Sequence, residues 1–417
     1  MNEKQVLIIG HQWVAPNASA AGTRMLQLIE FFQEANYQIC FACAAQKNPY
    51  SYDFSKSAVQ EVQIQLNDDG FDVLLQNLQP QMVVFDRFIS EEQYGWRVAK
   101  TLPNALRVLD TEDLHFLRKA RHLTQKSNRN LNFEDFQTED AFREIASIYR
   151  SDVSLIISKV EMKLLIDDFN ISPKLLHYLP LFANQSAIRY HDSFPDFQQR
   201  KDVFFIGNFL HEPNWDAVLY LKKEIWPLVH QKSPTLNLNI YGAFATQKVT
   251  DLHNSKERFF VHGHAPNAEE IFLKHRLLLA PLRFGAGIKG KLIMAMETGT
   301  PSITTSIGAE GIADDSNWNG VVENDSFEFA QAVVDLYDNE TAWQKAKMKG
   351  FQILQSEFNS QDFKADFLKK IETIISELNL HRQHNFIGQM LQHQSMQSTK
   401  YMSLWIQEKQ KNKSDSN

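Results

Sequence analysis

The sequence is poor in the residues that form disulfides and zinc sites. Among 417 residues there are two cysteines, Cys40 and Cys43. Their CxxC interval lies in an apolar stretch, residues 37–43, that predicts a β-strand, so the two side chains would point to opposite faces. No second Cys or His cluster at metal-ligand spacing accompanies them. We therefore expect two buried cytosolic thiols and no zinc site.

Long apolar runs and an excess of basic residues are also absent. The apolar run at residues 5–10 is too short to span a membrane and lacks a small-residue cleavage site. Acidic residues number 50 against 43 lysines and arginines, a formal net charge of −7, which argues against a dedicated nucleic-acid binder. We therefore expect a cytoplasmic protein with no signal peptide, no transmembrane helix and no nucleic-acid partner.

Two regions of alternating strand and helix patterns make up most of the chain. Apolar residues account for 43% of the sequence, which is ample for the cores of two or three domains. Between the two regions the periodicity is lost, as expected for a linker. The predicted organisation is a first α/β domain at 1–185, a linker at 186–201, a second α/β domain at 202–378 and a polar tail, helical or disordered, at 379–417.

The first region opens with a buried strand at residues 5–10, a loop at 11–22 and a helix from about Thr23. A nicotinamide-binding fold is not indicated, because the GxGxxG motif and the acidic residue after the second strand are both missing. The loop is long enough to line a cleft instead. The polar stretch at 118–150 is interpreted as a solvated pair of helices.

The most informative segment is 275–312. A strand at 277–282 breaks into a loop at residues 283–291, here called the glycine loop, and a helix follows. Glycines permit close approach of a ligand to the backbone, and the N-terminus of a helix attracts anions. Lys289 and Lys291 add positive charge. Because ligands bind beyond the carboxyl ends of parallel strands, this segment predicts a site for a phosphorylated or otherwise anionic small molecule.

Several segments carry a family resemblance. They are Pro281–Lys291, Gly299–Pro301, Ser306–Gly311, Gly207–Asn214 with Asp216, Asp110–Arg118 and Gly22–Arg24. With the two α/β halves, they resemble the GT-B glycosyltransferases, in particular the retaining family 4 (group 1) enzymes, up to about residue 378. The resemblance implies an α/β GT-B fold, with two Rossmann-like, doubly wound domains facing each other across a cleft, and C-terminal helices.

The resemblance also implies roles for particular residues. The donor, a nucleoside-diphosphate sugar, would contact Gly207, Asn208, Arg283, Gly285, Gly287, Lys289, Lys291 and Glu310. Gly22, Arg24 and Asp113 would lie on the acceptor side, and His115 would be the catalytic residue at the donor sugar. No cofactor and no metal are expected. From the residues alone, Arg24 is equally suited to a surface salt bridge on its helix and Asp113 to hydrogen bonds within its loop.

The sequence departs from the family pattern at two positions. Many members carry two glutamates eight residues apart, where this chain has Ala286 and Met294. Glu297 lies one helical turn beyond Met294, displaced along the axis. Asn208 and an uncharged turn also replace basic residues that many members carry after the first strand of the donor domain. Neutralisation of the diphosphate would then rest on Arg283, the two lysines of the glycine loop and backbone amides.

Two functions follow as hypotheses. The first is a cytoplasmic glycosyltransferase that moves a hexose, with retention, to a glycan, a lipid-linked acceptor or a protein, with a peripheral contact at the inner face of a membrane left open. The second is a GT-B protein that has lost turnover and binds a nucleotide or glycan as a partner subunit. Ala286 and Met294 favour the second. A phosphorylase is less well supported, because nothing resembles a pyridoxal-phosphate lysine site. An epimerase is also less well supported, and it would be expected to release free nucleotide and a sugar isomer without an acceptor.

Overall fold

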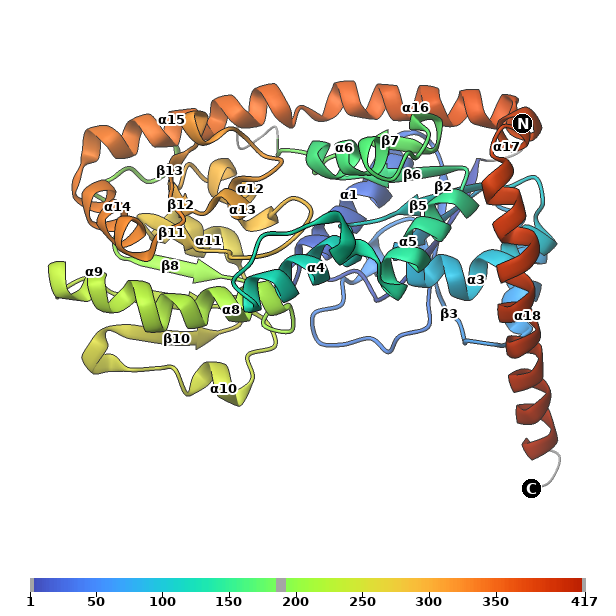
Figure 1. Ribbon diagram of the computed structural model, residues 1–417, viewed down its shortest axis with the longest axis horizontal. Helices are drawn as coiled ribbons and strands as arrows, with labels where there is room; N and C mark the ends of the chain where they lie inside the picture. Colours follow the sequence, from blue (N-terminus) through green and yellow to red (C-terminus); the bar gives the residue numbers. More distant parts are fainter. Residues whose placement is uncertain (1–3, 185–192, 415–417) are drawn as a thin grey trace.

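The computed structural model describes residues 4–184 and 193–414, and it contains two α/β domains that lie side by side along the long axis (Figure 1). Each domain has one parallel sheet with helices on its faces. The fold class expected from the sequence is confirmed. Residues 186–192 of the predicted linker lie outside the described residues.

The first domain is built on a sheet of seven parallel strands in the order β3-β2-β1-β4-β5-β6-β7. Its central strands are buried along their whole length, because helices cover both faces, and this is why they read as continuous apolar runs. The strands are β1 (Gln5–Gly10), β2 (Gln38–Cys43), β3 (Val59–Gln63), β4 (Met82–Asp86), β5 (Leu106–Asp110), β6 (Val153–Ile156) and β7 (Leu176–Tyr178).

Six helices accompany this sheet: α1 (Ala20–Glu34), α2 (Gly70–Leu78), α3 (Arg87–Thr101), α4 (His115–Lys126), α5 (Glu139–Arg150) and α6 (Lys159–Asp167). Helix α1 begins earlier than expected, because the Ser19 hydroxyl accepts a hydrogen bond of 3.0 Å from the Gly22 amide and caps the helix. Cys40 and Cys43 are both buried and pack in separate cores on opposite faces of β2, as predicted.

The second domain has six parallel strands in the order β10-β9-β8-β11-β12-β13. In both sheets the strand order reverses direction beside the first strand of the domain, so a crevice opens at the carboxyl ends of β1 and β4 and of the corresponding pair, β8 and β11. The strands are β8 (Val203–Ile206), β9 (Leu238–Tyr241), β10 (Phe259–Gly263), β11 (Leu277–Ala280), β12 (Ser302–Thr304) and β13 (Gly320–Val322).

The helices of the second domain include α12, which directly follows the glycine loop. They are α8 (Glu212–Tyr220), α9 (Trp226–Lys232), α10 (Gln247–Thr250), α11 (Ala268–Lys274), α12 (Gly290–Glu297), α13 (Ser306–Ala309), α14 (Ser326–Asp338) and α15 (Glu340–Glu357). A π-helical turn at Leu221–Ile225 joins α8 to α9. The segment Ser306–Gly311, one of those that carried the resemblance, contains the single turn α13, which the Thr305 hydroxyl caps.

The C-terminal helices return to the first domain. Helix α16 (Ser360–Ser376) runs along the upper edge of the view in Figure 1, followed by α17 (Leu378–Gln383) and α18 (Phe386–Ser414). Phe367, Ile371 and Ile374 of α16 are buried in the core beneath β1. The boundary expected at residue 378 therefore differs from the structure, because α16 packs with the first domain. No helix in the described part of the chain is long and apolar enough to span a membrane.

Candidate functional site

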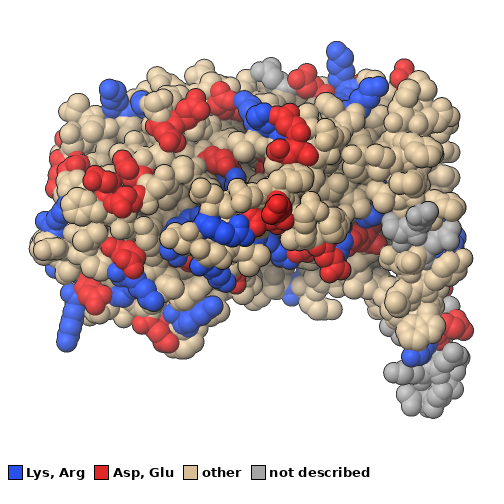
Figure 2. Space-filling model, viewed as in Figure 1, with Lys and Arg blue, Asp and Glu red and all other residues tan. Residues whose placement is uncertain are grey.

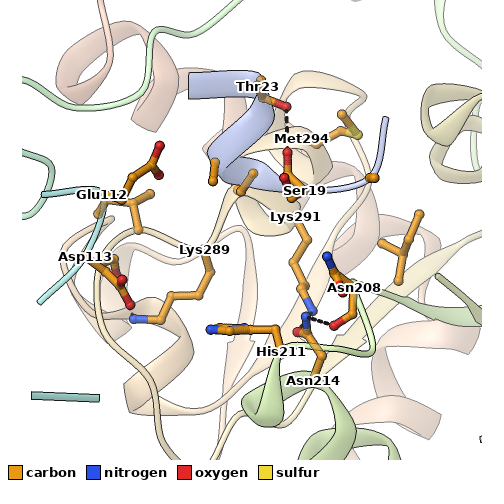
Figure 3. Close-up of a pocket in the computed structure, with 18 of the residues that line it drawn as sticks. Ser19, Thr23, Glu112, Asp113, Asn208, His211, Asn214, Lys289, Lys291 and Met294 are labelled. Atoms are coloured by element: carbon orange, nitrogen blue, oxygen red, sulfur yellow. Dashed lines mark hydrogen bonds between the residues drawn. The ribbon is translucent and has the colours of Figure 1, made fainter. Parts of the chain in front are cut away.

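A cavity of about 470 Å³ lies between the two domains, at the carboxyl ends of the strands (Figure 3). The first domain contributes the loop before α1 and the residues that follow β4 and β5. The second domain contributes the loops after β8 and β9, the glycine loop and one face of α12. The site thus forms where the two crevices of the fold face each other.

Lys289 and Lys291 extend from the start of α12 into this cavity (Figure 3). The Lys289 ammonium donates to the Gly287 carbonyl at 2.9 Å, and that of Lys291 donates to Asn214 Oδ1 at 2.6 Å and lies 4.1 Å from the centre of the Phe205 ring. Burial lowers the pKa of Lys289 to about 8, although Glu310 opposes the shift, and burial lowers the pKa of Lys291 to about 7.

The electrostatics of this wall suit an anion. Both lysines hydrogen-bond neutral oxygens, but Lys289 also feels the carboxylates of Glu310 and Glu161, so Lys291 is the less compensated of the two. Lys289 is the N-cap of α12 and makes no side-chain cap hydrogen bond, and Gly290 and Lys291 line the cavity, so the positive end of the helix dipole lies at this wall. A diphosphate placed here would meet two ammonium groups and free N–H donors.

The opposite wall carries His115 and Asp113. His115 Nε2 lies 3.4 Å from Asp113 Oδ1, and Asp113 also forms an ion pair with Arg118. Burial acts against ionisation of Asp113, but Arg118 and His115 hold its pKa below the usual range. Burial lowers the pKa of His115 to about 3, outweighing the attraction of Asp113. His115 is therefore a neutral imidazole near pH 7, oriented by a carboxylate.

The backbone of His115 is fixed by a carboxylate from α5. The amides of His115 and Phe116, at the start of α4, donate to the two oxygens of Glu144 at 3.2 and 3.0 Å. Glu144 is 1% exposed, so the interpretation of residues 118–150 as a solvated pair of helices is wrong at this position. Its carboxylate satisfies two amides that would otherwise lack partners at the helix N-terminus.

Two residues predicted on the acceptor side lie elsewhere. Arg24 is 2% exposed, and its guanidinium binds both oxygens of Asp110 at 2.8 to 3.1 Å and the Leu179 carbonyl at 2.8 Å. The prediction that Arg24 contacts the acceptor is wrong, because these groups use its donors inside the domain. Gly22 does not line the cavity either. A Cβ built there would lie 2.3 Å from the Ala15 carbonyl oxygen, so glycine is needed for packing.

Two predicted donor residues are also engaged outside the cavity. Arg283 pairs with Asp216, with an Nε–Oδ2 distance of 2.9 Å, and its guanidinium lies 4.6 Å from the centre of the Tyr220 ring. Glu310 forms a bidentate ion pair with Arg121 of α4, both distances being 2.7 Å. Neither lines the cavity. Asp216 thus holds Arg283 away from the cavity that the two lysines line, and its role in neutralising a diphosphate stays a prediction.

The remaining predicted residues meet at the cavity. Its lining includes Gly207, Asn208, Gly285, Gly287, Lys289, Lys291, Asp113 and His115, together with Ala286 and Met294. Both positions where the family pattern places a glutamate therefore face the space in which a donor would lie. Glu297 also lines this space despite its displacement along α12, and its Oε1 accepts a hydrogen bond of 2.7 Å from the Asn184 amide. Burial raises the pKa of Glu297 to about 7.

Some lining residues were not predicted from the sequence. Asn214 holds Lys291 and donates to the Asn208 carbonyl at 2.9 Å. It lies in a segment that carried the family resemblance, which was the available signal. His211 and Glu112 also line the cavity, and they too lie in segments that carried the resemblance, Gly207–Asn214 and Asp110–Arg118. Glu112 has a positive φ of 62°, which no sequence pattern marked.

Among residues 4–184 and 193–414, no group of three or more His, Cys, Asp or Glu side chains is arranged to hold a metal ion. Whether activity requires a metal or a cofactor is untested, and the expectation of neither stays a prediction. The polar side chains that line the cavity carry ammonium, guanidinium, imidazole, carboxylate, hydroxyl and amide groups.

Comparison with known proteins finds a family model that matches part of the chain, within and just before the second domain. Residues 200–339 match the family model described as "Glycosyl transferases group 1". A curated relative from Klebsiella pneumoniae, "Uncharacterized 44.6 kDa protein in cps region", is 24% identical over 178 residues. That alignment covers 40% of this chain and 45% of the relative, so the match spans less than half of the relative's length.

Solved structures match nearly the whole chain. A TarM variant from S. aureus, in complex with Fondaparinux, alpha-GlcNAc-glycerol and UDP, superimposes with a TM-score of 0.68 at 10% identity, covering 89% of this chain and 99% of TarM. HepE from Anabaena, in complex with UDP-glucose, gives a TM-score of 0.64 at 11% identity, covering 88% and 99%. At these identities the likeness establishes the fold.

Proposed function

We propose that this chain, which has the GT-B glycosyltransferase fold and a second domain matched by the group 1 glycosyl transferase model, is a glycosyltransferase. It would move a hexose from a nucleoside-diphosphate sugar to a glycan, a lipid-linked acceptor or a protein, with retention at the anomeric carbon. One observation carries the proposal. Lys289 and Lys291, at the start of α12, face His115 across a cavity between the domains. Structural neighbours crystallised with UDP or UDP-glucose lend support.

The geometry suits departure of a diphosphate leaving group. As the bond between the sugar and the diphosphate breaks, negative charge develops on the diphosphate. Lys289, Lys291 and the first amides of α12 would stabilise that charge, and they act most strongly where the closed cavity excludes water. This scheme requires no metal ion, because ammonium groups take the role of the counter-charge.

His115 is the proposed catalytic residue. Its imidazole is neutral near pH 7, because burial lowers its pKa to about 3. It can therefore form a hydrogen bond with a sugar hydroxyl without carrying a charge. Asp113, 3.4 Å away, would fix the ring orientation. The proposal of retention rests on the family resemblance, and so does the proposed role of Asp113 on the acceptor side.

A panel of UDP-, GDP- and ADP-sugars tests the proposal. We expect one donor to bind and to be hydrolysed slowly in the absence of an acceptor. Lys289→Ala and His115→Ala should each lower the rate of donor hydrolysis on the order of a hundredfold. Lys163→Ala should leave that rate unchanged, because the Lys163 side chain is 78% exposed. If no donor nucleotide binds the protein, both this function and the nucleotide-binding alternative are wrong.

The alternative is a GT-B protein that binds a nucleotide or glycan without turnover. Ala286 and Met294 favour it, because both line the cavity and neither offers a strong acceptor to a hydroxyl. Binding without donor hydrolysis would support this alternative. Met294→Glu separates the two further. A carboxylate that accepts a ribose hydroxyl should tighten UDP binding by about tenfold, and hydrolysis should appear only if the remaining groups are catalytically competent.

The proposed setting is cytoplasmic, with a peripheral contact at the inner face of a membrane if the acceptor is lipid-linked. Large apolar side chains on the exposed side of α18, including Phe386, Tyr401 and Trp405, support such a contact. Flotation with anionic vesicles tests it, and a protein that stays in the aqueous fraction at low salt would contradict it. On the face drawn in Figure 2, acidic and basic side chains are interspersed, which supports the absence of a nucleic-acid partner.

A further inference from the structure

Arg121 of the first domain makes three hydrogen bonds to the second. Its guanidinium donates to both oxygens of Glu310 at 2.7 Å, and it donates to the Gly285 carbonyl at 2.8 Å. Arg121 and Glu310 are both largely buried. A planar guanidinium that holds a carboxylate through two bonds is a geometrically specific contact. It fixes the first half of the glycine loop against the start of the 310–311 turn.

Glu161, at the start of α6, holds the second half of the loop. Its Oε1 accepts from the Gly287 amide at 2.7 Å and from the Leu114 amide at 3.2 Å, and the side chain is fully buried. One carboxylate of the first domain therefore bridges a strand-end loop of its own domain and the glycine loop of the other. The Gly287 N–H group therefore donates to Glu161 and not to a ligand.

The glycines of this region lie against the first domain. A Cβ on Gly287 would come within 2.8 Å of the Asp113 Cβ, one on Gly290 within 2.8 Å of the Ala20 Cβ, and one on Gly311 within 2.7 Å of the Ser158 Oγ. These separations are too short for a real side chain. The sequence suggested that glycine lets a ligand approach the backbone. At these three positions it lets the other domain approach.

Gly285 is the exception. A Cβ there would meet nothing closer than 3.7 Å, so no packing contact requires glycine at that position. Within the glycine loop, the two glycines that leave no room for a Cβ, Gly287 and Gly290, are therefore those that meet the first domain.

We propose that Arg121 and Glu161 are positioning residues that hold the glycine loop in its ligand-binding shape from the opposite domain, so that the donor site is complete only when the two domains are closed. The inference rests on the proposed function only for the identity of the ligand. Separation of the domains would release the Gly285 carbonyl and the Gly287 amide, and Lys289, Gly290 and Lys291 follow directly in the chain.

Other contacts across the cavity hold the same closed arrangement. The His122 ring, next to Arg121, stacks on Phe284 with a centroid distance of 4.1 Å and an angle of 10°. On the far side of the cavity, Tyr50 meets Phe244 edge to face at 4.9 Å. These rings pack the two rims, whereas Arg121 and Glu161 are the residues that bind the backbone of the glycine loop itself.

Hydrogen exchange of the full chain, read by mass spectrometry without any ligand, tests the proposal. Arg121→Met and Glu310→Gln remove the same ion pair from its two sides, and each should speed exchange in the 283–291 peptide by about tenfold or more. Exchange in β8 should not change, because that strand is in the core of the second domain. Arg143→Met is the matched control, since Arg143 forms a comparable bidentate pair with Glu92 inside the first domain.

Substitutions at Glu161 give a second, independent measurement. Glu161→Gln keeps an oxygen that can accept from the Gly287 amide and should keep the protection of the loop, whereas Glu161→Leu should lose it. Unchanged loop exchange in both Arg121→Met and Glu310→Gln would overturn the proposal, and so would an equal increase in β8. If the unaltered protein binds no UDP, the proposed function fails while the exchange data still decide the role of Arg121 and Glu161.

Discussion

Binding of a nucleoside diphosphate should draw protons onto Lys289 and Lys291. In the free protein, burial lowers the pKa of Lys289 to about 8 and that of Lys291 to about 7, against an ordinary value of 10.5. At pH 8 about half of the first and about a tenth of the second would then carry a charge. A diphosphate beside both ammonium groups favours their charged forms and raises both pKa values.

The expected uptake at pH 8 is therefore between about one and one and a half protons per UDP bound. By linkage, the affinity should fall about tenfold from pH 7 to pH 8, and more steeply above that. The phosphates of UDP remain ionised over this range, because the last phosphate pKa is about 6. His211, which also lines the cavity, should not contribute, since burial lowers its pKa to about 4 and leaves it neutral throughout.

Titration calorimetry in two buffers of different ionisation enthalpy measures the uptake directly. Lys291→Met should leave only the share of Lys289, about half a proton at pH 8. Lys163→Met should leave the uptake unchanged, because Lys163 is exposed and paired with Asp167. If UDP binds at pH 8 without net proton uptake, and with an affinity that is flat from pH 6.5 to pH 9, the two lysines do not face the diphosphate as deduced.

Three further predictions concern packing. Gly290→Ala should weaken UDP binding by about tenfold, because the added methyl group obstructs closure against Ala20. Adding Ala20→Gly removes the clashing atom and should restore the affinity. Calorimetry of the single and double variants measures this, and a double variant that still binds weakly would contradict it. Arg24→Met should lower the free energy of unfolding by about 3 to 5 kcal/mol by leaving Asp110 buried without its partner; denaturant titration measures it, and a loss under 1 kcal/mol would be inconsistent. The two cysteines, whose pKa burial raises to about 11, should resist thiol reagents until the protein unfolds, and fast labelling of the native protein would contradict this.

The central strands of the two sheets could be predicted from the sequence. Strands β1, β4 and β8 are covered on both sides and appear as uninterrupted apolar runs. Strand β3 was not predicted, because it lies at the sheet edge and its sequence, VQEVQ, is half exposed. Strand β7 has only three residues, too few for a periodic signal. An apolar run in the sequence thus indicates a strand that is buried on both faces, and edge strands lack such a run.

The candidate site could be predicted only in part, because a residue does not indicate partners that lie far away in the sequence. Lys289 and Lys291 were predicted from their place at the start of a helix. Arg24 looked like an exposed helix residue, since nothing near it in the sequence points to Asp110, which is 86 positions away. The second domain was expected to reach residue 378, because nothing within the sequence of α16 says which of the two sheets this helix covers. Hence the boundary at 378 was misplaced.

The return of α16 to the first domain has a mechanical consequence. The chain passes between the domains twice, once after β7 and once at the end of α15, and the Ala183 amide donates to the Phe358 carbonyl at 3.1 Å where the two passages meet. Because the two connections meet at one place, we expect any relative motion of the domains to pivot near this junction. The two connections also mean that residues 1–184 expressed alone would leave the groove for Phe367 open to water. Any dissection of this protein should therefore graft residues 359–378 back onto the first half.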